Sequence, residues 1–69
     1  MQLGTRWSAG GEIPARVPAD LHPAIRAVEA SGATGSWTLT FLEGRPIAEL
    51  DAGFEVALQA DGSVTTERF

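Results

Sequence analysis

The chain contains no cysteine, lysine, tyrosine or asparagine. The absence of cysteine excludes disulfides, thiolate zinc sites, iron–sulfur clusters and cysteine nucleophiles. Without lysine, the only basic side chains besides one histidine are five arginines against nine acidic residues, and the formal net charge is −4. Such a balance disfavours nucleic acid and anionic lipid as partners. No apolar run approaches the ~20 residues of a membrane span, and the N-terminus lacks the apolar core of a signal peptide. We therefore expect a cytoplasmic protein.

A chain of 69 residues makes a single domain, 1–69, and such a domain removes only about 60% of its unfolded surface from water. Its stability is expected to be marginal. In small scaffolds, disulfides, a metal or a partner often supply the stability that the core alone does not provide. With no cysteine present, good local packing or self-association has to fill that role.

The first 19 residues are expected to form an edge strand followed by an extended connection. Leu3, Thr5 and Trp7 alternate within Gln2 to Trp7, which favours a short strand. Two glycines and two prolines between residues 10 and 18 exclude a regular ladder in the connection. Its two large apolar residues, Ile13 and Val17, are predicted to pin it to the core.

Residues 20–32 predict a helix at about Leu21 to Ser31, with Asp20 as N-cap and Gly32 in the left-handed position after the C-cap. Pro23 falls in the first turn, where its missing N–H has no intrahelical partner in any case. One apolar stripe is expected to face the sheet, with the spacing i, i+3, i+4 and i+7. Its members are Leu21, Ala24, Ile25 and Val28.

Residues 36–69 predict a four-stranded antiparallel meander, because apolar residues recur at every second position between glycine turns. A two-residue turn at 43–44 pairs Leu42 with Arg45, and three-residue turns at 51–53 and 60–62 pair Leu50 with Phe54 and Gln59 with Ser63. This register puts the large apolar residues on one face. They are Trp37, Leu39, Phe41, Ala48, Leu50, Phe54, Val56, Leu58 and Val64. The fold class is therefore α+β: one helix packed on the meander, extended by the N-terminal edge strand.

The same register aligns Thr38, Glu49, Glu55 and Glu67 in one row on the opposite face. Like charges on neighbouring strands are unfavourable, so the row invites an explanation. A docking face for a basic partner is one interpretation, and a loose Mg²⁺ or Ca²⁺ site is another. The simpler interpretation, which we favour on the sequence alone, is a solvated face whose charges oppose aggregation. Metal binding is disfavoured because no loop supplies a carbonyl-rich cage.

Two further residues are candidates for partner binding. Trp7 is an aromatic anchor if it and Leu3 are not covered by the connecting segment. Arg45 follows the turn at 43–44 and is predicted to be an exposed charge at a hairpin tip. By contrast, Asp51 and Asp61 lie in glycine turns, where aspartate commonly bonds nearby backbone N–H groups.

No catalytic or cofactor motif is assembled by this sequence. His22 needs a nucleophile or substrate proton within hydrogen-bond reach to act as a base, and an Asp-x-His pair at a helix start is commonly local capping. The glycines at 10–11 and 32–35 match neither a P-loop nor a dinucleotide fingerprint, because Gly35 follows a helix and precedes a strand. No cofactor and no bound metal are expected.

The run from Trp37 to Pro46, together with the opening Met1-Gln-Leu-Gly-Thr-Arg-Trp7, resembles short uncharacterised proteins of high-GC Gram-positive bacteria. This resemblance implies a bacterial cytoplasmic protein. It implies no activity.

The leading hypothesis for function is a noncatalytic protein-interaction module or accessory subunit. It would self-associate or dock on a larger protein, through the outer sheet face or an edge strand. The candidate partner-binding residues are Glu49, Glu55, Glu67, Trp7 and Arg45. One alternative is an acidic inhibitor or antitoxin-like protein that occupies a basic surface. A second alternative is a small enzyme or enzyme subunit that uses His22 with a carboxylate.

Overall fold

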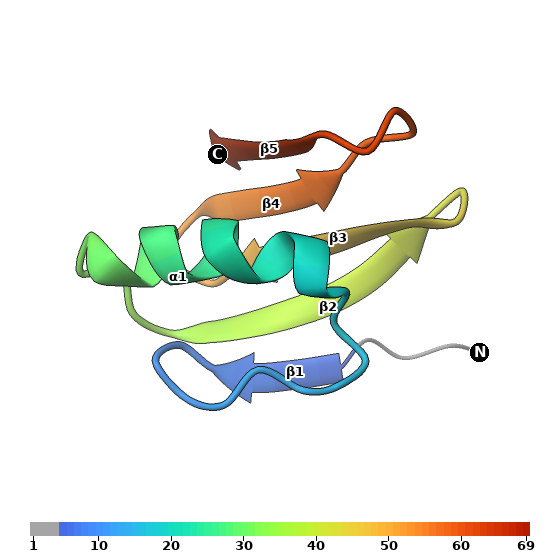
Figure 1. Cartoon of the computed structure of the whole chain (residues 1–69). Helices are drawn as coiled ribbons and strands as arrows, with labels where there is room; N and C mark the ends of the chain where they lie inside the picture. Colours follow the sequence, from blue (N-terminus) through green and yellow to red (C-terminus); the bar gives the residue numbers. More distant parts are fainter. Residues whose placement is uncertain (1–4) are drawn as a thin grey trace.

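The computed structural model describes residues 5–69 as one helix packed on one face of a five-stranded antiparallel sheet (Figure 1). The sheet order follows the chain, β1-β2-β3-β4-β5. The elements are β1 (Thr5–Ser8), the 3₁₀ turn η1 (Ala19–Leu21), α1 (His22–Ala30), β2 (Ser36–Leu42), β3 (Arg45–Leu50), β4 (Phe54–Leu58) and β5 (Val64–Arg68). The predicted α+β class and the N-terminal edge strand are confirmed.

The predicted register of the meander is also confirmed. Leu42 pairs with Arg45 and Leu50 with Phe54, while the N–H of Gln59 donates to the carbonyl of Ser63 at 2.7 Å. Backbone conformation at the turns explains this outcome, because Glu43 and Gly44 both have positive φ, at 54° and 81°. That combination defines the hairpin turn whose twist matches the flanking strands.

The helix begins differently from the prediction. Asp20 is not its N-cap: it lies inside η1, and its side chain makes no capping hydrogen bond. Leu21 occupies the N-cap of α1. Pro18 precedes the segment in extended backbone, so the chain enters through a 3₁₀ turn, which moves the start of the α-helix past Asp20. Gly32 has φ +98° after the C-cap Ser31, as expected of a helix end.

The core lies between α1 and the sheet and includes both tryptophans. Their rings stack with centroids 6.2 Å apart, and Trp37 is fully buried. Val17, from the connecting segment, is 2% exposed, and Ile13 packs against the same cluster. The predicted helix stripe and the pinning role of the connection are therefore confirmed. The buried apolar residues of this cluster are Trp7, Val17, Leu21, Ile25, Val28, Trp37, Leu39, Ala48, Leu50 and Val56.

Phe41 lies on the predicted inner face, but the helix does not cover it there, and it is 59% exposed. The nine residues of α1 span about 14 Å, whereas the seven of β2 span about 23 Å. The β2–β3 hairpin therefore runs past the end of the helix (Figure 1). Phe54, Leu58 and Val64 share the inner face and are half-buried. Within residues 5–69, no helix is long and apolar enough to cross a membrane.

Candidate functional site: the open sheet face

The face of the sheet opposite α1 carries the predicted row of glutamates. Thr38 pairs with Glu49, Glu49 with Glu55 and Glu55 with Glu67. Since neighbouring strands lie about 4.8 Å apart, the three carboxylate side chains stand next to one another. Glu49 and Glu67 are exposed and Glu55 is half-buried. We call this surface, with the residues that flank the row, the open face.

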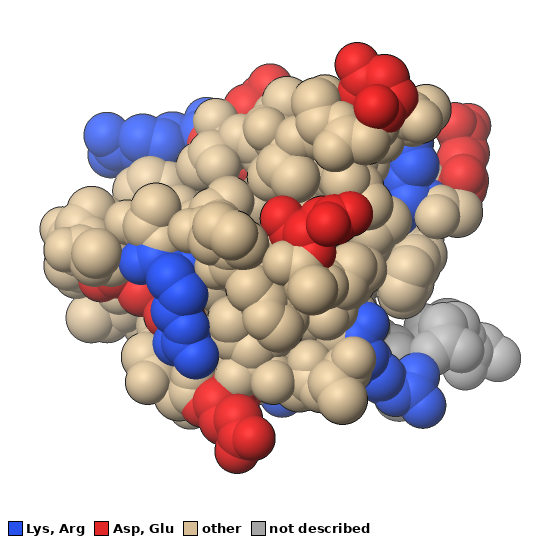
Figure 2. All heavy atoms as spheres, viewed as in Figure 1, with Lys and Arg blue, Asp and Glu red and all other residues tan. Residues whose placement is uncertain are grey.

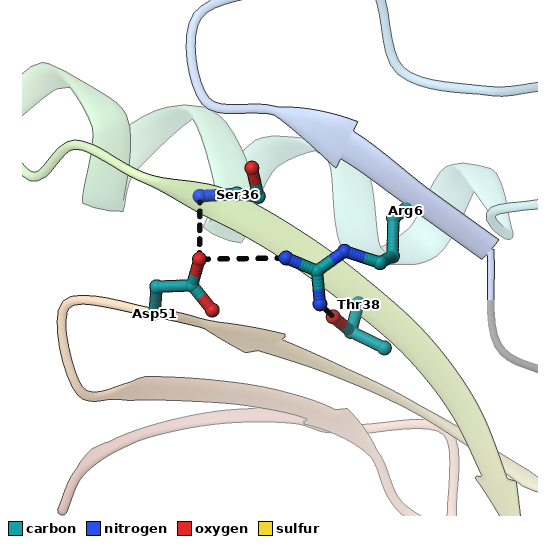
Figure 3. A network of polar contacts seen from close by, with 4 residues as sticks. All are labelled: Arg6, Ser36, Thr38 and Asp51. Carbon is teal, nitrogen blue, oxygen red and sulfur yellow. Dashed lines mark hydrogen bonds and ion pairs between the residues drawn. The ribbon is translucent and has the colours of Figure 1, made fainter.

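Arg6 extends the row onto β1, where it pairs with Thr38. Its guanidinium donates to Thr38 Oγ1 at 2.8 Å and lies 3.5 Å from Asp51 Oδ2 (Figure 3). Asp51 Oδ2 also accepts the backbone N–H of Ser36 at 3.3 Å. The sequence analysis missed Arg6 because no turn fixes the register of β1 against β2. From β1 to β5, the row therefore begins with the Arg6 guanidinium and ends with three glutamate carboxylates.

A second polar chain crosses the open face beside the row. Arg45 Nη1 donates to Gln59 Oε1 at 3.0 Å, and Gln59 Nε2 donates to Thr65 Oγ1 at 3.0 Å. Arg45 was expected to be an exposed tip, but its side chain is only 37% exposed because it lies along β4 toward Gln59. Between the two polar rows lie Thr40, Ile47 and Ala57, and Ala57 is 8% exposed.

The open face is hollowed at the end near β1. A shallow depression of about 320 Å³ is lined by Arg6, Thr38, Glu49, Leu50, Asp51 and Phe69. Its lining thus includes one guanidinium, two carboxylates and one aromatic residue. The opposite, helix-covered face carries charges of both signs, scattered among uncharged side chains (Figure 2).

Trp7 does not meet the condition for an aromatic anchor. It is 8% exposed, because it belongs to the buried cluster that also contains Val17 of the connecting segment, and its ring stacks on Trp37. The indole N–H of Trp7 is buried and has no hydrogen-bond partner among the described residues. Leu3, the other half of the proposed anchor, lies outside the described residues. Trp7 is therefore a core residue.

Glu29 is not a member of the predicted apolar stripe, yet it holds the helix to the sheet. Its side chain is 8% exposed. Glu29 Oε2 accepts the indole N–H of Trp37 at 2.9 Å, and Oε1 accepts Arg26 Nη1 at 2.8 Å. Burial raises the pKa of Glu29, but hydrogen bonds from the Gly10 backbone, Arg26 and Trp37 outweigh it, so the pKa is lowered. The apolar stripe predicts which side of the helix faces the sheet, but it gives no sign that the Glu29 carboxylate is buried beside that stripe.

His22 is half-buried at the start of α1, and its Nε2 lies 3.1 Å from the Val17 carbonyl oxygen. Among the described residues, Asp20 makes no hydrogen bond with it. This contact ties the helix start to the connecting segment. The geometry gives no positive sign of catalysis at His22.

The two turn aspartates differ in what they bind. Asp61 Oδ1 accepts both the N–H and the hydroxyl of Ser63, at 2.9 and 2.7 Å, and these bonds lower the pKa of Asp61. Its predicted turn-building role is confirmed. Asp51 instead bonds across the sheet, to Ser36 and Arg6. Residues 5–69 contain no cluster of three or more His, Asp or Glu side chains that could hold a metal ion.

Comparison with protein-family models, with curated proteins and with solved structures gives no match. The function is therefore argued from the open face alone.

Proposed function

We propose that this chain is a noncatalytic protein-interaction module whose open face docks a cationic segment of another protein. The observation that carries this proposal is the adjacent placement of Glu49, Glu55 and Glu67 on a face that α1 does not cover. Like charges on neighbouring strands cost a few tenths of a kcal/mol or more. A partner's arginine or lysine side chains would offset that cost.

The neighbouring row supports docking over simple solvation. Ile47 and Ala57 give the open face a short apolar strip between the carboxylates and the Arg45–Gln59 chain. Interfaces commonly combine an apolar centre with a polar rim. The best-fitting partner is a basic segment that also presents an apolar side chain. Complementary charge would mainly speed association and select the partner.

Isothermal titration with a nona-arginine peptide tests the charge component directly. The triple variant E49Q/E55Q/E67Q removes the row. The matched control E12Q/D20N/E43Q removes three carboxylates from exposed positions elsewhere. We expect affinity to fall about tenfold in the first variant and by less than about twofold in the control, at constant ionic strength. Equal losses in both would show that only net charge matters, and would overturn the proposal.

An acidic inhibitor or antitoxin-like protein is the second candidate, and the same three adjacent carboxylates favour it. Its partner would be a basic nucleic-acid-binding surface. The two candidates differ in competition: duplex DNA would displace this chain from its partner under the second candidate, because both ligands would use one basic surface.

A further inference from the structure

Strand β5 is the open edge of the sheet, since it pairs with β4 alone. Four of its five residues are exposed. Ser63 accepts a backbone hydrogen bond from Gln59, and Phe69 donates one to Gly53. Because such bonds alternate along an antiparallel strand, Thr65 and Glu67 bond to β4. The N–H and C=O groups of Val64, Thr66 and Arg68 therefore point away from the sheet.

The other edge offers less. Strand β1 has four residues, and Ala9 continues its bonding to β2 through the Gly35 carbonyl. By the same alternation, among the described residues of β1 only Arg6 and Ser8 direct backbone groups outward, and the Ser8 carbonyl already accepts the N–H of Gly11 at 3.0 Å. Figure 1 shows nothing beyond β5. A long run of unpaired outward groups is a template for pairing with another strand.

The geometry points to a second copy of this chain as the partner of β5, paired antiparallel about a two-fold axis at Thr66. A two-fold axis normal to the sheet keeps each residue on its own face, so Thr66 meets Thr66 and Val64 meets Arg68. In this register the outward residues Val64, Thr66 and Arg68 all pair with outward residues of the second copy, which gives about six backbone hydrogen bonds between the copies. A two-fold axis at Thr65 or Glu67 would give only about four. An axis at Glu67 would also oppose two glutamates.

The side chains of β5 are compatible with a second copy as the occupant in this register. Arg68 forms no ion pair with a described residue, and its guanidinium lies 5.3 Å from the centre of the Phe54 ring. In the register at Thr66, Arg68 faces Val64 of the second copy, next to the turn that carries the exposed Asp61. The symmetry repeats this arrangement at both ends. Glu67 faces the hydroxyl of Thr65 rather than another carboxylate.

This dimer is expected to be weak and strengthened by salt. Five-residue strands bury less than the about 1,200 Å² of a standard interface. Each copy carries a net charge of −4, and added salt screens the repulsion between copies. The inference is independent of the open-face proposal, because its tests contain no basic ligand.

Introduced cysteines test the register, since the chain has none of its own. In Thr66→Cys, paired Cα atoms would lie about 5.5 Å apart, within the about 4.4–6.8 Å that a disulfide spans. Thr65→Cys is the control. In this register position 65 lies opposite position 67 of the second copy, so the two Cα atoms at position 65 would be more than about 7 Å apart, too far for a disulfide. We expect at least about tenfold more disulfide dimer from Thr66→Cys under mild oxidation. Equal yields would overturn the register.

Sedimentation equilibrium of the unmodified chain and of Thr66→Pro tests the edge itself. Proline at Thr66 removes an outward N–H and leaves the hydrogen bonds to β4 in place. We expect a concentration-dependent dimer for the unmodified chain, more of it in high salt, and a monomer for Thr66→Pro. Circular dichroism checks that this variant folds. A monomeric unmodified chain at millimolar concentration would overturn the proposal.

Discussion

Glu29 shows how one buried carboxylate can orient an element. It accepts hydrogen bonds from Trp37 on β2 and from Arg26 one turn earlier on the helix. Hydrogen bonds to a charged group contribute roughly 1.5–3 kcal/mol each, more than neutral ones. The bond from Trp37 fixes the rotation of α1 about its axis against the sheet, and the bond from Arg26 holds the Glu29 side chain in place.

Glu29→Gln should lower the free energy of unfolding by about 1–2 kcal/mol, because the amide is a weaker acceptor for the Trp37 and Arg26 donors. Urea denaturation measures this. Glu12→Gln, at an exposed position, is the control and should change stability by less than about 0.5 kcal/mol.

The pH dependence of stability follows from the lowered pKa of Glu29. Burial raises this pKa, and the hydrogen bonds from Gly10, Arg26 and Trp37 lower it below the ordinary 4.5. The stabilisation is therefore fully present above pH 4.5 and is lost as the pH falls through the lower pKa of the folded state. Glu29→Gln should remove this component of the acid loss. An unchanged acid profile in the variant would contradict the role assigned to Glu29.

Among the elements, the β4–β5 pair depends on a glycine in the preceding turn. Gly53 has φ +107°, and a Cβ there would lie 2.9 Å from the carbonyl oxygen of Phe69. The N–H of Phe69 donates to the Gly53 carbonyl at 2.8 Å. Any side chain at Gly53 therefore pushes against Phe69, which continues the pairing of β5 with β4.

Gly53→Ala is expected to cost about 2–3 kcal/mol, from the positive φ and from the displaced contact with Phe69. Gly62→Ala is the matched control: its φ is +92°, but nothing lies within 4 Å of its Cβ position. That variant should cost about 1 kcal/mol, for backbone conformation alone. Thermal unfolding of both separates the steric part from the conformational part, and equal costs would refute the steric part.

The sequence was sufficient to predict the register of the strands, but not how far the helix covers them or where the helix begins. Turn chemistry at 43–44, 51–53 and 60–62 determined the register, because a slip by one residue would expose a strand's whole apolar set. The exposure of Phe41 could not be inferred from alternation, which gives the face but not the length of the cover. The start of α1 was missed for a similar reason, since Pro18 and the 3₁₀ turn outweighed the capping preference of Asp20.

For the whole molecule, the open face was predictable where turns connect its strands and unpredictable where they do not. Glu49, Glu55 and Glu67 were placed correctly by three hairpins. Arg6 was not placed, because a helix and a long connection separate β1 from β2. Trp7 was ambiguous because the sequence does not show that it joins the same buried cluster as Trp37 and Val17.

The row of glutamates should carry a measurable cost in stability. Glu55 is flanked by Glu49 and Glu67, and like charges on neighbouring strands are unfavourable. Glu55→Gln is therefore expected to raise the free energy of unfolding by a few tenths of a kcal/mol at low salt. The gain should shrink at high salt, where the repulsion is screened. A loss of stability would mean that the row does not destabilise the folded chain.

The central claim is that the open face, rather than net charge, binds a cationic partner. Two-dimensional ¹H–¹⁵N spectra recorded during titration with nona-arginine test it most directly. We predict that the backbone amides of Thr38, Glu49, Glu55 and Glu67 shift most, while those of α1 stay in place. Shifts spread evenly over the exposed acidic residues, or concentrated on α1, would contradict the account.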